Sequence, residues 1–264
     1  MKKTPKKIIA LISVRSNSKR LFNKSLRKYK GKNAIDRIIE NIKASKYINK
    51  IIVATSKNNS DTKIVDHCKK IRISCFRGDE INLIERFYQS GKKYNPKIIV
   101  RITGDNPFIS FEIADFMIKN HLKKKADFTY MDRTNLPAGI CPEIINFNCL
   151  EKILKSNINF KYSEYMTYYF INNPKFFNLN KIKPLKSFRF NDFKLRFSLD
   201  YKKDLIFLKK IIDLLKNPKG PIKLSRLYQV ARKNPEIAKI NKNLKTKWKS
   251  KKLIHQINKA SIIV

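Results

Sequence analysis

The first half of the chain alternates between short apolar runs and segments whose apolar residues recur at helical spacing. Four runs have the length of a buried β-strand, at residues 7–14, 51–55, 73–76 and 98–103. In the segments between and after them, apolar residues recur every three or four positions, as on one face of a helix. We expect Asn33, Ser60 and Ser110 to cap three of these helices, because their side-chain oxygens can accept the first unpaired backbone N–H groups.

Four strand–helix pairs in succession predict a parallel sheet that is covered by helices on both faces. Because crossovers between parallel strands are right-handed, the expected fold is a Rossmann-like, doubly wound, mostly parallel α/β sheet. Ligands of such sheets bind beyond the carboxyl ends of the strands. The loops at those ends are residues 15–24, 55–59, 77–79 and 104–107.

The second half of the chain is less regular. Its patterns predict strands at 128–131 and 143–147, short helices at 150–154 and 164–171, and a helix at 204–215. Residues 188–199 alternate well enough to predict one long strand or a hairpin. After Pro218 and Pro221 the sequence is Lys-rich, with sparse apolar residues at helical spacing. We therefore expect a main domain over residues 1–217 and a helical C-terminal extension over 218–264.

Composition adds a strong positive charge to this picture. The 264 residues include 60 Lys and Arg against 20 Asp and Glu, for a net charge of +40, while 42% apolar residues suffice for a core. Such a charge is compatible with nucleic-acid binding. However, Lys outnumbers Arg 47 to 13, and Ile and Asn are also abundant. Since these residues share A/T-rich codons and nucleic-acid binders favour Arg, we attribute most of the charge to a biased genome.

The same composition bears on the compartment. No apolar run approaches the roughly 18 residues that a membrane span requires. The four cysteines show neither a C-x-x-C motif nor the spacing of a zinc site. We therefore expect reduced thiols in a cytoplasmic protein.

Three segments carry candidate chemistry, although neither a P-loop nor a G-x-G-x-x-G motif is present. The loop at 15–24 places cations and hydroxyl groups where a triphosphate could be held, although a solvated basic loop would explain the same residues equally well. Asp105 follows the fourth strand and could hold Mg²⁺ against nucleotide phosphates, or it could simply cap a turn. Asp200 and Asp204 end another apolar segment. Spacing alone does not show whether Asp105 and Asp200 meet.

Together these motifs resemble the cytidylyltransferase family, which activates acidic sugars. The chain is most similar to the SpsF-like branch for spore-coat polysaccharide, and more distantly to the Kdo and acylneuraminate cytidylyltransferases. The family pattern Q-A-R-x-x-S-x-R-L-P-G-K is matched at Arg15, Ser18, Arg20, Leu21 and Lys24. Residues 101–107 resemble R-I-T-G-D-x-P, and residues 196–204 resemble R-W-T-V-D-x-x-x-D.

The resemblance implies a nucleotide-diphospho-sugar transferase type of fold and a role for each matched residue. Residues 1–217 would form the nucleotidyltransferase domain, with an inserted acceptor and dimerisation subdomain at about 127–190. The triphosphate would be bound by Arg15, Ser18, Arg20 and Lys24. The base and ribose would be approached by Arg77, Arg86 and Thr103. Mg²⁺, the cofactor, would be held by Asp105 and Asp200, which with Arg15 and Lys24 would form the catalytic set. The acceptor would be faced by Gly139, Glu143, Tyr162, Glu164 and Arg196.

The resemblance implies a homodimer that transfers CMP from CTP to an acidic sugar for surface polysaccharide, releases pyrophosphate and binds no specific nucleic acid. The chain departs from the family pattern at Phe22-Asn23, where Pro-Gly is usual. Departures on the acceptor side are larger: R-G-x-D becomes Ala138-Gly139-Ile140-Cys141, and R-E-H becomes Ser163-Glu164-Tyr165. An unusual acceptor or a partly degenerate enzyme would explain them. The residues are also compatible with a nucleotide-sugar glycosyltransferase, and the charge with a basic nucleic-acid-binding protein.

Overall fold

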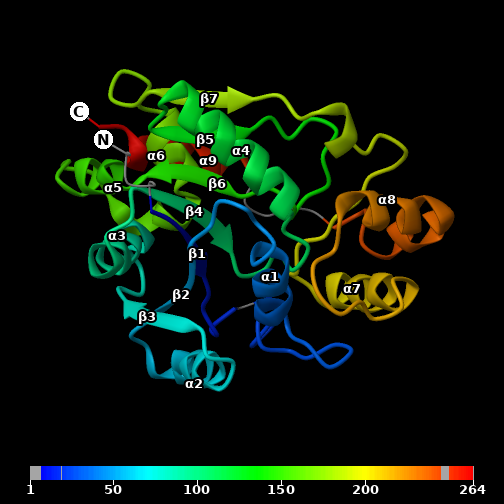
Figure 1. The fold of residues 1–264 in the computed structure, drawn as a ribbon. Helices are drawn as coiled ribbons and strands as arrows, with labels where there is room; N and C mark the ends of the chain where they lie inside the picture. The colour runs from blue at the N-terminus through cyan, green and yellow to red at the C-terminus, as the bar shows by residue number, and fades with distance from the viewer. Residues whose placement is uncertain (1–6, 19, 245–249, 264) are drawn as a thin grey trace, which may run out of the picture.

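The computed structural model describes residues 7–18, 20–244 and 250–263. Within these residues it contains one seven-stranded sheet of order β3-β2-β1-β4-β6-β5-β7 (Figure 1). The strands are β1 (Ile8–Ser13), β2 (Lys50–Ser56), β3 (Ser74–Gly78), β4 (Ile98–Thr103), β5 (Phe128–Met131), β6 (Glu143–Asn146) and β7 (Leu179–Ile182). The α-helices are α1 (Ala34–Ile42), α2 (Thr62–Lys70), α3 (Leu83–Tyr94), α4 (Phe111–Lys124), α5 (Phe147–Leu154), α6 (Thr167–Ile171), α7 (Lys202–Leu214), α8 (Leu224–Lys233) and α9 (Lys251–Ser261). Short 3-10 helices are η1 (Asn59–Asp61), η2 (Phe160–Tyr165), η3 (Lys186–Phe188) and η4 (Pro235–Ile240).

The predicted doubly wound sheet is confirmed for strands β1 to β4. They pair in parallel in the order 3-2-1-4, so that the chain reverses its direction of travel across the sheet between β1 and β4. Strand β6 runs antiparallel to both β4 and β5, while β5 and β7 pair in parallel. The sheet is therefore mixed and mostly parallel, and the region at 127–190 contributes β5, β6 and β7 to it.

Alternate side chains of β1 enter two separate cores. Ile8, Ala10 and Ile12 pack with α1, α2, α4, α7 and α8, whereas Ile9 and Leu11 pack with α3, α5 and α6. All five residues are at most 3% exposed. Continuous apolar runs, rather than alternating ones, mark these strands because both faces of the sheet are covered (Figure 1).

Two of the three predicted helix caps are confirmed. Asn33 forms a capping box with Asp36 at the start of α1, and the Ser110 side chain accepts a hydrogen bond from the Ile113 N–H in α4. The prediction for Ser60 is wrong. Ser60 lies inside η1, which is capped by Asn58, and α2 begins only after Asp61. Asn58 and Ser60 are both residues that commonly cap helices, and their local spacing does not show which of them caps this helical segment.

The prediction of a strand or hairpin over 188–199 is also wrong. Apolar residues of this segment such as Phe190 and Phe197 are buried, but so is Arg196, which stands between buried Leu195 and Phe197. The backbone instead makes isolated hydrogen bonds to three different places: Phe190 N–H to Asn135, Phe197 N–H to Ala138 and Leu199 N–H to Asp105. Burial in this segment therefore follows its contacts with several parts of the fold, and not one face of a strand.

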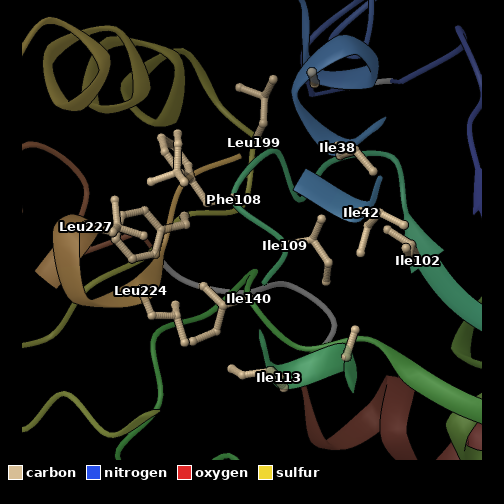
Figure 2. Close-up of a cluster of buried hydrophobic side chains, with 14 of the residues drawn as sticks. Ile38, Ile42, Ile102, Phe108, Ile109, Ile113, Ile140, Leu199, Leu224 and Leu227 are labelled. Atoms are coloured by element: carbon tan, nitrogen blue, oxygen red, sulfur yellow. The ribbon is translucent and has the colours of Figure 1, made fainter. Parts of the chain in front are cut away.

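The C-terminal extension packs on the rest of the chain in two places. Helix α8 lies beside α7 at one side of the molecule, and its Leu224 and Leu227 meet Phe108 and Ile140 in the cluster of Figure 2. Helix α9 packs on η2 and α6, where Asn172 donates to Ser261 Oγ at 2.8 Å. Throughout the described residues, no helix has both the length and the apolar character to cross a membrane.

Replacing Ile140 with alanine should lower the free energy of unfolding by about 3 kcal/mol, because Ile140 is fully buried where α8 meets the loop after β4 and truncation leaves a cavity. Urea denaturation followed by circular dichroism measures this. Ile206→Ala on α7 is the matched control, since Ile206 is 54% exposed and should change stability by less than about 0.5 kcal/mol. Equal effects of the two substitutions would contradict this account of the packing.

Candidate functional site

The loops after β1 and β4 lie side by side at the carboxyl edge of the sheet. The Gly104 N–H donates to Ser13 O at 2.8 Å, and a Cβ at Gly104 would lie only 2.7 Å from the side chain of Val14. A larger residue would force the two strand ends apart. This close approach brings Lys24, on the loop after β1, within reach of Asp105, on the loop after β4.

Lys24 joins the two aspartates that the sequence singled out. Its ammonium lies 2.8 Å from Asp105 Oδ2 and 3.0 Å from Asp200 Oδ1. The Leu199 N–H donates to Asp105 O at 2.7 Å, so the backbones beside the two carboxylates are also linked. Asp105 and Asp200, whose meeting the spacing left open, therefore share one cation.

Two arginines complete the pairing of Asp200. Arg20 Nη2 lies 2.5 Å from Asp200 Oδ1, and Arg196 Nη2 lies 2.6 Å from Asp200 Oδ2. The Asp200 side chain is 11% exposed, whereas that of Arg20 is 34% exposed. Arg20 therefore reaches the carboxylate from the solvent side and Arg196 from inside the protein.

The pairing shifts the pKa of both Lys24 and Asp105. Burial alone would lower the pKa of the Lys24 ammonium, but Asp105 and Asp200 raise it above its ordinary value. Burial alone would raise the pKa of Asp105, but Lys24 and a hydrogen bond from Thr103 hold it below its ordinary value. Both groups are consequently charged at neutral pH.

The loop that carries Lys24 is held by two features. Asn23 has a φ of +52°, in the left-handed region that Asn tolerates, at the position where the family has glycine. Buried Asp61 accepts hydrogen bonds from the Ser16 N–H at 2.6 Å and from Thr55 Oγ1 at 2.8 Å. The sequence motifs did not point to Asp61; its signal was a scarce acidic residue close after the second strand.

Arg15 lies at the edge of this cluster. It pairs with Glu164 at 3.0 Å, with both side chains 40% or more exposed, and it donates to the Glu80 carbonyl at 3.2 Å. Ser18 is half-buried, and its N–H donates to Ser16 O. The structure thus brings Arg20 and Lys24 together, while Arg15 spans from the same loop to η2.

Arg77 lies in β3, and Arg86 lies in α3 beside Gly78 at the end of that strand. The Arg77 guanidinium donates to the carbonyls of residues 56, 57 and 58, so that it ties the ends of β2 and β3 together. Arg77 and Gly78 also line an open cavity of about 700 Å³. Arg86 is 2% exposed, and its Nε and Nη1 have no hydrogen-bond partner among the described residues. Burial, followed by the nearby Arg15, lowers the pKa of Arg86 to about 10.

The predicted acceptor residues occupy two different environments. Glu143 is buried and bonds Arg101 Nη1 at 2.6 Å; burial would raise its pKa, but Arg101 and Arg133 hold it below its ordinary value. Glu164 is exposed on η2, where the neighbouring Tyr162 hydroxyl donates to Gln256 of α9.

Gly139 has a structural reason to be glycine. Its φ is +94°, and a Cβ there would lie 2.8 Å from the backbone nitrogen of Ser198.

Tyr165 is half-buried, and burial together with Glu164 raises its pKa to about 12, so its hydroxyl stays protonated. The sequence motifs did not single out Tyr165, although its difference from the histidine of the R-E-H pattern was visible in the sequence.

The donor set suits a divalent cation. Asp105 and Asp200 offer hard carboxylate oxygens that already share one positive group, and Mg²⁺ commonly takes one or two carboxylates together with substrate phosphates. Within the described ranges no group of three or more His, Cys, Asp and Glu side chains is arranged to hold a metal. The residues therefore fit a cation that a bound phosphate helps to hold.

Comparison with known proteins shows what the chain is similar to. Residues 9–247 match the family described as "Cytidylyltransferase". The chain is 35% identical to an uncharacterized protein of Methanocaldococcus jannaschii, over 91% of this chain and 97% of the relative. It is 30% identical to the spore coat polysaccharide biosynthesis protein SpsF of Bacillus subtilis, over 88% and 96%. A solved cytidylyltransferase from Leptospira borgpetersenii has a TM-score of 0.81 at 29% identity, covering 91% of this chain and all of that one.

Lys24→Met should lower the free energy of unfolding by about 3 kcal/mol near neutral pH, because it leaves two carboxylates without their shared cation. The lowered pKa of Asp105 means that its pairing with Lys24 stabilises the fold above the ordinary pKa of an aspartate and is lost as pH falls through the lowered value. In the variant the carboxylates protonate more readily, so its deficit should shrink as pH falls toward about 5.

Urea denaturation at both pH values measures this difference. Lys30→Met serves as the control, since the exposed Lys30–Asp213 pair should contribute less than about 1 kcal/mol. A deficit of the Lys24 variant that grows on acidification would contradict the pairing described here.

Proposed function

The chain belongs to the cytidylyltransferase family, and on that premise we propose that it transfers CMP from CTP to an acidic sugar or a similar acceptor. Pyrophosphate is the second product. The homology to SpsF supports a role in surface-polysaccharide biosynthesis. The observation that carries the proposal is the Lys24–Asp105–Asp200 cluster at the carboxyl edge of the sheet.

In this reaction an acceptor oxygen attacks the α-phosphorus of CTP and the bond to pyrophosphate breaks. Arg20 and Lys24 lie on the loop after β1, where a parallel sheet binds its ligands, and would balance the charge that develops on the leaving pyrophosphate. Arg15 would join them when its exposed pair with Glu164 opens. Each of these cations is already paired with a carboxylate, so the triphosphate would exchange one anionic partner for another.

Asp105 and Asp200 would hold Mg²⁺, which when bound supplies positive charge against the phosphate oxygens. Thr103 supports the position of Asp105 through its hydrogen bond. None of the three histidines has a place in this scheme. His67 bonds Asp36 at the start of α1, and His121 bonds Thr129, so both have structural partners elsewhere.

The nucleotide side would use the residues around the second and third strand ends. Arg77 and Gly78 line the open cavity, and buried Arg86, which lies against Gly78, carries two unpartnered nitrogens. Unpartnered donors of a buried cation favour an anionic or carbonyl ligand, because leaving them unbonded costs free energy. These features support the approach of the base and ribose to this side.

The acceptor side would lie between η2 and β6. Glu143, Tyr162 and Glu164 are the residues that we assign to it, together with the backbone at Gly139. Arg196, which the sequence assigned to the acceptor, is buried and bonds Asp200 and Asp204 instead. Arg133, which is 61% exposed and 3.7 Å from Glu143, supplies a cation that an acidic acceptor could use. The altered segments at 138–141 and 163–165 support an unusual acceptor, and a cytoplasmic homodimer remains our prediction.

Pyrophosphate release should depend on CTP, Mg²⁺ and an acidic sugar together. A coupled pyrophosphate assay would test each nucleoside triphosphate against a panel of acidic sugars, with CTP expected to be the productive nucleotide. Release with another nucleotide alone, or with none of the combinations, would contradict the proposal.

Asp105→Asn and Asp200→Asn should each lower the rate of pyrophosphate release by about 100-fold or more, because each removes one charged ligand from the cation site. Melting temperature and circular dichroism would show that the variants fold. Asp192→Asn is the matched control, since Asp192 pairs with Arg232 on the surface and should retain full activity. Wild-type turnover in either site variant would remove that aspartate from the mechanism.

A further inference from the structure

Asp204 lies behind the candidate site and is fully buried. Its Oδ2 accepts the backbone N–H groups of Asp200 at 2.9 Å and Tyr201 at 3.0 Å. Its Oδ1 accepts Arg196 Nε at 3.0 Å. The carboxylate therefore fixes both the backbone at Asp200 and the guanidinium that bonds its side chain.

Arg196 bridges the carboxylates of Asp204 and Asp200. One end of its guanidinium bonds Asp204, and Nη2 bonds Asp200 Oδ2 at 2.6 Å. With Oδ2 held from inside, Oδ1 faces Lys24 and Arg20. The orientation of Asp200 thus depends on where Arg196 and Asp204 are held.

One residue from the C-terminal extension reaches this pair. Asn241 follows η4, which packs on α7, and it is 2% exposed. Its Nδ2 donates to Asp204 Oδ1 at 2.9 Å and to Arg196 O at 3.0 Å. A single amide group therefore bonds both members of the pair that orients Asp200.

We propose that Asn241 is a positioning residue, through which the C-terminal extension sets the orientation of the Asp200 carboxylate for a phosphate-bound cation. The inference rests on the proposed function, in which Asp200 is one of two cation ligands. Asn241 contacts neither Asp200 nor the loop after β1 through any hydrogen bond of the described residues, so it acts through Asp204 and Arg196.

The chemistry requires an amide at this position. The Asn241 NH₂ group supplies two donors, which match the Asp204 carboxylate and the Arg196 carbonyl. Leucine has similar size but no donor, and would leave both acceptors short of a partner. Aspartate would place a second carboxylate against Asp204 and compete for Arg196.

The test is Mg²⁺-dependent CTP binding by isothermal titration calorimetry, with pyrophosphate release measured in parallel. Asn241→Leu and the milder Asn241→Ala should each raise the Mg²⁺ concentration for half-maximal CTP binding by about ten-fold or more, the usual scale for residues that orient metal ligands. Asn243→Leu is the matched control, because Asn243 is exposed two residues away and should bind as wild type.

A merely structural role would lower the melting temperature of the folded variants without moving their Mg²⁺ dependence, and that result would overturn the inference. In an Asp204→Asn background, Asn241→Ala should add little, since the two act in series; full additivity would also overturn it. If the wild type binds CTP with Mg²⁺ but releases no pyrophosphate, the proposed reaction fails while the binding comparison still decides on Asn241. If the wild type binds no CTP, both are overturned.

Discussion

The shared ion pair of Lys24 with Asp105 and Asp200 joins the three segments on which the candidate site depends. Lys24 comes from the loop after β1, Asp105 follows β4, and Asp200 precedes α7. Desolvating charges is costly, so such a cluster adds little net stability, although breaking it by removing one partner is strongly destabilising. Removing any one member would leave its partners charged and partly buried.

The sheet explains why these segments meet. Strands β1 and β4 are neighbours although two strand–helix units separate them along the chain, and their carboxyl ends approach closely at Gly104. The C-terminal extension packs against these segments in two places. Helix α8 covers the loop after β4, and Asn241 bonds Asp204 and Arg196, which hold Asp200. Helix α9 packs on η2, which carries Glu164 opposite Arg15.

The net charge of +40 is spread unevenly between surface and interior. Most of the described lysines are exposed, whereas several of the few acidic residues are buried at or beside the site: Asp61, Glu143, Asp200 and Asp204. A buried carboxylate is tolerated only with partners, and each of these accepts hydrogen bonds from backbone, hydroxyl or guanidinium groups. The scarce acidic residues were therefore the more informative part of the composition.

The sequence by itself determined the four parallel strands, two of the helix caps, the motif loops and the family. These features follow from local periodicity and short-range hydrogen bonds, which neighbouring residues decide. The sequence did not predict the start of α2 or the irregular path of residues 188–199, because the same local pattern suits more than one backbone path. Only the tertiary structure decided that Asp105 and Asp200 share Lys24, and that Asn241 bonds the pair behind them. Contacts between residues so far apart along the chain depend on how the sheet and the C-terminal extension pack, which no local pattern encodes.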